Sequence, residues 1–145
     1  MMTETPCLGC KLANRKIDTH TVYENEFVAC ILDLAPLNEG HILILPKRHY
    51  HDVDDLDEAT ASEIMKASKM LSKLLKVQYK PDGITIIQNN GVFNDLTHYH
   101  MHVFPRYHAD GFSWVEPIDS TKAKDRLKET AEVLSTSLNQ LNGNA

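Results

Sequence analysis

Apolar residues recur along this chain with two different periods, and each period predicts a type of element. Between residues 57 and 79 they return every three or four positions, the spacing of one helix face; they are Ile64, Ala67, Leu71, Leu74 and Leu75. Acidic residues open the segment, where they favour the positive end of the helix dipole, and Pro81-Asp82-Gly83 follows it. The pattern predicts one amphipathic helix from Asp57 to about Tyr79.

Short runs of β-branched and aliphatic residues predict four strands. They cover Glu26–Leu32, His41–Leu45, Ile84–Gln88 and His98–Pro105. The turn formers of residues 33–40 separate the first two runs, which we therefore expect to be antiparallel neighbours. A second amphipathic segment, between Lys122 and Leu141, predicts a C-terminal helix; its apolar face comprises Leu127, Ala131, Leu134, Leu138 and Leu141.

Together these elements predict an α+β fold, with an antiparallel sheet, one long central helix and a C-terminal helix. The chain contains no repeat, no low-complexity tract and no Pro/Gly/Ser-rich linker that would divide it. We therefore expect one domain over residues 7–110 and a C-terminal extension over residues 111–145.

Composition and charge narrow the class of protein. The 145 residues are 42% hydrophobic and 24% charged, as in one globular domain. A net charge of -5 disfavours binding to nucleic acid polymers but still permits the binding of one small anionic ligand. We find no signal-like N-terminus and no run of roughly 20 apolar residues, and three cysteines are too few for a disulfide framework. We expect a cytoplasmic protein with reduced thiols and no membrane association.

The most informative segment is His98-Tyr99-His100-Met101-His102, in which histidines alternate with apolar residues. Side chains alternate between the faces of a strand, so the three imidazoles should share one face above an apolar reverse face. Their Cα atoms would then be ~6.6 Å apart, a spacing that suits groups along an extended anion such as a polyphosphate. One histidine on the wet side of a strand is ordinary, whereas three in strict alternation favour a site.

A pair of cysteines, Cys7-Leu8-Gly9-Cys10, has the spacing of a zinc knuckle. Zinc prefers four nitrogen or sulfur ligands in a tetrahedron, and His49 and His98 would complete such a set. The alternatives are a redox pair and two thiols without a role. A redox Cys-x-x-Cys normally lies where a strand meets a helix, and no predicted strand precedes this one, so we favour structural zinc.

The histidine segment resembles the signature of the histidine triad family, His-φ-His-φ-His-φ-φ with φ apolar, over residues 98–104. The resemblance extends upstream to Gly40–His49, which is similar to the family's Gly-His strand and Pro-Lys-x-His turn, and to Gln88–Gly91. It covers about Cys7 to Pro105, with the motifs in the family's order. It implies the family's fold and a nucleotide hydrolase, such as a phosphoramidase, or a nucleotidyl transferase acting at the phosphate of AMP-like groups.

The same resemblance assigns roles to individual residues. It implies that His100 attacks the α-phosphorus of a purine nucleotide, that His102 contacts phosphate oxygens and that His41 supports the site. It further implies that Asn89 binds phosphate and that Asp33 accepts from the ribose hydroxyls. Some family members carry zinc with the first triad histidine as a ligand, and enzymes of this length commonly form homodimers.

One segment departs from the family pattern. The family usually carries Gly-Gln and a small hydroxyl residue just before the triad, whereas this chain has Phe93-Asn94-Asp95-Leu96-Thr97. Asn94 or Thr97 is the candidate to replace those nucleotide contacts, and Asp95 would repel phosphate. The sequence therefore does not identify the leaving group of the substrate.

Imidazole chemistry supports the assignment independently of the family. A neutral imidazole is a competent nucleophile near pH 7 when one ring nitrogen is held as a donor, and its attack on phosphorus gives a covalent intermediate. The chain lacks a Walker loop and a Gly-x-Ser-x-Gly elbow, which disfavours kinases and serine hydrolases. Two other functions stay open: a nucleotide-binding adaptor without turnover, and a zinc protein whose histidines serve structure only.

Overall fold

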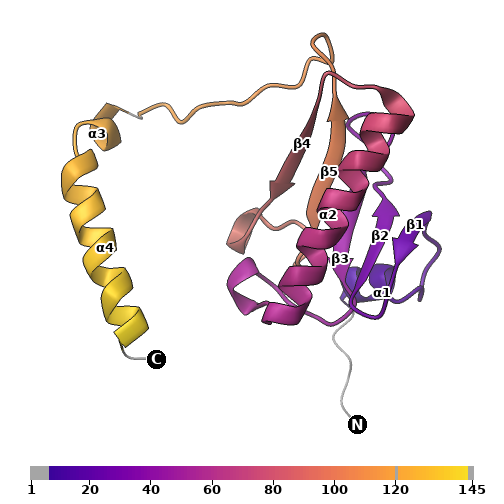
Figure 1. Cartoon of the computed structure of the whole chain (residues 1–145), viewed down its shortest axis with the longest axis horizontal. Helices are drawn as coiled ribbons and strands as arrows, with labels where there is room; N and C mark the ends of the chain where they lie inside the picture. Colours follow the sequence, from indigo (N-terminus) through magenta and orange to yellow (C-terminus); the bar gives the residue numbers. More distant parts are fainter. Residues whose placement is uncertain (1–6, 120, 144–145) are drawn as a thin grey trace. The chain divides into compact units, whose positions relative to one another are not determined.

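The computed structural model describes residues 7–119 and 121–143, and its chain divides into two compact units, Met1–Asp110 and Gly111–Ala145 (Figure 1). Residues 1–6, in which the sequence predicts no signal, lie outside the described residues. Among the described helices, none combines the length and the apolar character needed to cross a bilayer.

The first unit is built on a five-stranded sheet in which all neighbours are antiparallel, in the order β1-β2-β3-β5-β4. Its strands are β1 (Thr21–Glu24), β2 (Val28–Leu32), β3 (Ile42–Pro46), β4 (Gly83–Gln88) and β5 (Met101–Arg106). The predicted α+β class and the predicted antiparallel pairing of β2 with β3 are confirmed. The order places β5, which carries the end of the histidine segment, inside the sheet between β3 and β4.

One face of the sheet is covered by α2 (Glu58–Tyr79), which confirms the predicted helix. The Asp57 carboxylate caps its start by accepting from the Thr60 amide at 2.8 Å, and Lys80, in the left-handed conformation, ends it before Pro81. Ile64, Leu71 and Leu75 are buried against the sheet. Leu74 belongs to the predicted apolar stripe but is 45% exposed, because it lies to one side of the buried face.

The other face of the sheet packs against α1 (Leu8–Ala13), an element that the sequence pattern did not predict. A second core cluster lies here, made of Ala13, Ala29, Ile31, Leu43 and Leu45. The predicted alternation of the histidine segment is present, since Tyr99, Met101 and Val103 pack in the cluster on the α2 side.

The histidine strand is shorter than expected. It begins at Met101 instead of His98, because residues 98–100 hydrogen-bond outside the sheet. The Tyr99 amide donates to the carbonyl of Tyr50 at 2.7 Å, and the ring of His98 bonds to the carbonyl of Pro46.

The second unit contains α3 (Thr121–Lys124) and α4 (Leu127–Gly143). The predicted C-terminal helix is thus present from Leu127, while Lys122 belongs to the separate short helix α3. All described positions of the apolar stripe of α4 are exposed within the chain.

Candidate functional site

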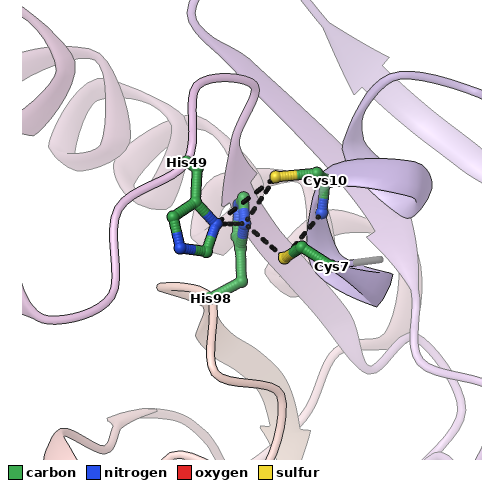
Figure 2. A group of neighbouring side chains, drawn as sticks. All are labelled: Cys7, Cys10, His49 and His98. Carbon is green, nitrogen blue, oxygen red and sulfur yellow. Dashed lines mark hydrogen bonds between the residues drawn. The ribbon is translucent and has the colours of Figure 1, made fainter. Parts of the chain in front are cut away.

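The two cysteines and two histidines expected to bind metal converge on one point (Figure 2). Cys7 caps α1 and Cys10 lies within it, while His49 follows β3 and His98 precedes β5. The Nδ1 atom of His98 lies 3.5 Å from the sulfur of each cysteine and 3.3 Å from Nδ1 of His49. Sulfur of Cys10 and Nδ1 of His49 are 3.4 Å apart.

Hydrogen bonding fixes which atom of His98 faces this point. Its Nε2 lies 2.8 Å from the carbonyl oxygen of Pro46, which can only accept, so the ring proton is on Nε2 and Nδ1 presents a lone pair. Burial lowers the pKa of His98 to about 4, which keeps the ring neutral. Such a bond from the far ring nitrogen is the usual support of a metal-binding histidine.

The spacing of the four atoms also fits a metal ion. Ligands at ~2.0–2.3 Å around tetrahedral zinc are ~3.3–3.8 Å from one another. Here the separations within the trio of Cys10, His49 and His98 and between Cys7 and His98 run from 3.3 to 3.5 Å, and all four ligand atoms lie within 4.8 Å of one another. The donor set is two sulfurs and two imidazole nitrogens, the type found in structural zinc sites. The residues present therefore fit zinc.

The close approach of α1 to His98 depends on Gly9. A Cβ atom at this position would lie 2.3 Å from Cβ of His98, closer than atoms can approach. The residue between the cysteines thus decides whether Cys7 and Cys10 reach the histidines.

His100 is held with one ring nitrogen as a donor. Its Nδ1 lies 2.9 Å from the carbonyl oxygen of His98, so Nδ1 carries the proton and Nε2 presents the lone pair. The residue is 4% exposed, so its orientation is fixed by the surrounding protein. Its Nε2 lies 3.3 Å from a carboxylate oxygen of Asp95.

His41 and His102 form a directed chain of hydrogen bonds. The Leu37 amide donates to Nδ1 of His41 at 3.1 Å, which leaves the His41 proton on Nε2. That Nε2 donates to Nδ1 of His102 at 2.9 Å, so the His102 proton is on its own Nε2. Burial lowers the pKa of His41, against an opposing effect of Asp33. Burial, with repulsion from His100 and His41, lowers the pKa of His102 to about 4.

Asp33 lies beside this pair. One of its oxygens is 3.6 Å from Nε2 of His41 and 3.8 Å from Nδ1 of His102, and the other accepts from the Ala35 amide at 2.9 Å. The three side chains are close enough to consider a second metal site. The amide of Leu37 argues against it. A neutral His41 that accepts this bond at Nδ1 must keep its proton on Nε2, so neither ring nitrogen offers a lone pair to a metal ion. The arrangement suits proton transfer better than metal binding.

Comparison with known proteins decides the family. The sequence model of the HIT domain matches residues 14–109. The chain belongs to the HIT family. An uncharacterised HIT-like protein of Methanocaldococcus jannaschii is 34% identical over 128 residues, which cover 84% of this chain and 98% of that protein. The adenosine 5'-monophosphoramidase of Candida albicans is 28% identical over 142 residues, which cover 89% and 93%.

Solved HIT structures share the fold. A crystal structure of a HIT family protein from Bacillus anthracis superposes with a TM-score of 0.80 at 29% identity, covering 93% of this chain and 99% of that one. A zinc-bound histidine triad family protein from Mycobacterium smegmatis gives a TM-score of 0.69 at 26% identity, covering 97% and 98%. The resemblance inferred from the histidine segment is confirmed.

The other predicted nucleotide ligands of this HIT chain lie in two different environments. Asn89 is exposed and directly follows Gln88, whose partner across the sheet is Met101, so it lies beside the triad. Asn94 is buried, and its amide is already engaged: Nδ2 donates to the His51 carbonyl at 2.9 Å and Oδ1 accepts from the Leu96 amide at 3.2 Å.

Three of the groups that fix the orientation of the imidazoles in the HIT site are backbone groups. They are the carbonyls of Pro46 and His98 and the amide of Leu37. Sequence reasoning identified none of the three, since a backbone group leaves no signal in residue type. The contact between Asp95 and His100 was missed as well, although the charge of Asp95 marks it as unusual beside a phosphate site.

Proposed function

We propose that this HIT protein is a nucleotide hydrolase or nucleotidyl transferase that acts at the α-phosphate of a purine nucleotide. The observation that carries the proposal is the hydrogen bond from Nδ1 of His100 to the His98 carbonyl, because it leaves a fixed lone pair on Nε2. The likeness to a protein named adenosine 5'-monophosphoramidase supports the substrate class.

In the first step, Nε2 of His100 forms a bond to phosphorus and the bond from phosphorus to the leaving group breaks. The leaving atom takes the electron pair and a proton from water, while Nε2 of His102, held in the required tautomer by His41, donates a hydrogen bond to a phosphate oxygen. In the second step the hydroxide left from that water attacks phosphorus, and the electron pair of the N–P bond returns to His100. Another acceptor in place of water gives nucleotidyl transfer.

Substrate binding uses the remaining polar groups around the triad. In our proposal Asp33 accepts from the ribose hydroxyls, while Asn89 and His102 contact phosphate oxygens. Asn94 is 3% exposed, and both of its amide atoms already bond within the chain, so we assign it to shaping the turn instead. This is a site for one small anion, in keeping with a net charge of -5 and no nucleic acid polymer as partner.

The test is to trap the intermediate. The protein is mixed with an adenosine 5'-phosphoramidate and quenched in base, where a nucleotidyl-histidine survives, and the adduct is mapped by mass spectrometry. We expect it on His100, and we expect His100→Ala to abolish turnover while it keeps AMP binding. His20→Ala, an exposed histidine before β1, is the matched control and should react like wild type.

Each competing function predicts a distinct experimental result. AMP binding without any adduct or turnover indicates a non-catalytic adaptor. Turnover that survives in His100→Ala indicates that the triad serves structure only and contradicts the proposed nucleophile.

The proposal includes a structural zinc held by Cys7, Cys10, His49 and His98. Bound there, zinc would tie α1 to the segments before β5 and after β3. Protein purified without added metal should contain about one zinc per chain, as a closed four-ligand site requires. Cys10→Ser should lose it, whereas Cys30→Ser, at the buried cysteine of β2, should retain it. Much less than one zinc in wild type contradicts this part.

We also propose a cytoplasmic homodimer. Strand β4 lies at the edge of the sheet, and its Ile86 is 46% exposed. On α2 the side chains of Met70, Leu74 and Val77 are exposed as well, which gives apolar surface next to an unpaired edge. Light scattering at micromolar protein should give twice the chain mass, and Ile86→Lys should lower it. A monomeric mass for wild type contradicts the dimer.

A further inference from the structure

The carboxylate of Asp95 occupies the approach to the nucleophile. Its oxygen lies 3.3 Å from Nε2 of His100, and its side chain is 90% exposed whereas that of His100 is 5% exposed. An exposed anionic group therefore lies beside the atom of the buried ring that, in our proposal, attacks phosphorus.

The backbone, more than the side chain, holds Asp95 there. The residue before it, Asn94, is buried and bonded to the His51 carbonyl and the Leu96 amide. The Thr97 amide donates to the Asn94 carbonyl at 3.4 Å, which closes the turn, and His98 is anchored immediately afterwards. The carboxylate can rotate aside for a substrate, but its charge cannot leave the site.

A reacting phosphorus must come within ~3–3.5 Å of Nε2, which is the distance at which the carboxylate now lies. The leaving group begins one bond further on, well inside the ~8 Å range over which charges interact at physiological ionic strength. An anionic leaving group such as a polyphosphate is therefore repelled by Asp95, and a leaving group with a positive charge is attracted.

We propose that Asp95 is a specificity-determining residue that selects nucleotidyl donors with a positively charged leaving group, as in the amide of a nucleotide with a diamine-like or lysine-like amine. The inference rests on the proposed function and names its substrate class. It assigns Asp95 no bond and no proton in the reaction, only a charge beside the leaving group.

The test uses three adenosine 5'-phosphoramidates whose leaving amines share one alkyl chain and end in an ammonium, a hydroxyl or a carboxylate. Because Asp95 is exposed and screened, we expect wild type to prefer the ammonium over the carboxylate compound by on the order of tenfold in kcat/KM. Asp95→Asn should bring the two rates together, and Asp95→Lys should invert the preference. Raising the salt concentration should narrow the wild-type ratio. Asp18→Asn, at an exposed position before β1, is the matched control and should keep that ratio.

A readout besides turnover separates this inference from the proposed function. Titration with AMP should show several-fold tighter binding to Asp95→Asn than to wild type, since the product is an anion. If wild type cleaves the compounds but its ratio survives in Asp95→Asn, the inference is overturned and the proposed function stands. If wild type cleaves none of them, the proposed function fails. In that case equal AMP affinity of the two proteins rejects the role of Asp95 too.

Discussion

The Nε2 proton of His41 points at Nδ1 of His102, 2.9 Å away across the paired strands β3 and β5. Because the Leu37 amide fixes the other end of the His41 ring, this bond runs in one direction only. A rotated His102 would place a proton against the proton of His41. The two rings thus share one tautomeric state, in which Nε2 of His102 carries the donated proton.

We predict that His41→Ala lowers kcat by about 10- to 100-fold, the usual effect of losing a residue that orients a functional side chain. KM should change little, because His41 is buried and acts through His102. Steady-state kinetics on an adenosine phosphoramidate separates the two constants. His41→Gln keeps an N–H donor and should recover part of kcat. A raised KM with unchanged kcat would show that His41 binds substrate instead.

We predict that His102 makes folding stability depend on pH. Its pKa is lowered to about 4 in the folded chain, against ~6.5 in the unfolded chain. The unfolded state therefore binds more protons between these values, so stability is complete above pH ~6.5 and falls as the pH drops toward 4. The slope from one such group reaches ~1.4 kcal/mol per pH unit.

Urea unfolding of wild type and His102→Gln at several pH values checks this. The difference in unfolding free energy between the two proteins should shrink from pH 7 to pH 4.5. Two curves that stay parallel over this range would contradict the pKa shift of His102.

We predict that Gly9→Ala abolishes metal binding by α1. Its methyl group cannot coexist with His98, whose Cβ would lie 2.3 Å away, so α1 must move and carry Cys7 and Cys10 with it. Zinc content should fall well below that of wild type, with a lower melting temperature. Gly83→Ala, where an added Cβ meets nothing within 4 Å and the backbone has no positive φ, is the control for metal content. Full zinc occupancy in Gly9→Ala would contradict the packing.

We predict that Asn94→Ala destabilises the first unit by ~1–3 kcal/mol, the cost of leaving buried polar groups without partners. The groups concerned are the His51 carbonyl and the Leu96 amide. Asn89→Ala is the comparison for stability, since Asn89 is exposed, and should change it by less than ~0.5 kcal/mol. Equal stability of the two variants would mean that the turn before the triad does not depend on Asn94.

The parts of the fold that could be predicted are those specified by neighbours in sequence. The helix Glu58–Tyr79 has its period, its Asp57 cap and its terminating proline within one segment. By contrast β1 has only four residues, none of them buried, and exists because it pairs with β2. Helix α1, with six residues, is too short to be read from a period.

The candidate site likewise has features that the sequence predicts and features that it does not. The spacing of His98, His100 and His102 predicted side chains that the fold does bring together with His41 and with the two cysteines, while the roles assigned to them stay predictions. The direction of each imidazole could not be predicted, because it depends on backbone groups of Pro46 and Leu37, which any residue offers. The role of Asn94 stays a prediction: its type suits a ligand, while its burial and two hydrogen bonds favour the role in the turn proposed above.

His98 connects the cluster at α1 to the triad through two different atoms. Its Nδ1 faces both sulfurs, and its carbonyl oxygen accepts from the ring of His100. If zinc and nucleotide bind as proposed, zinc immobilises the residue that aligns the proposed nucleophile, and a nucleotide held on His100 in turn favours the zinc-bound arrangement. Thermodynamic reciprocity then requires each ligand to change the affinity for the other by the same factor. The supply of metal in a cell would thereby set the fraction of chains that are ready to react.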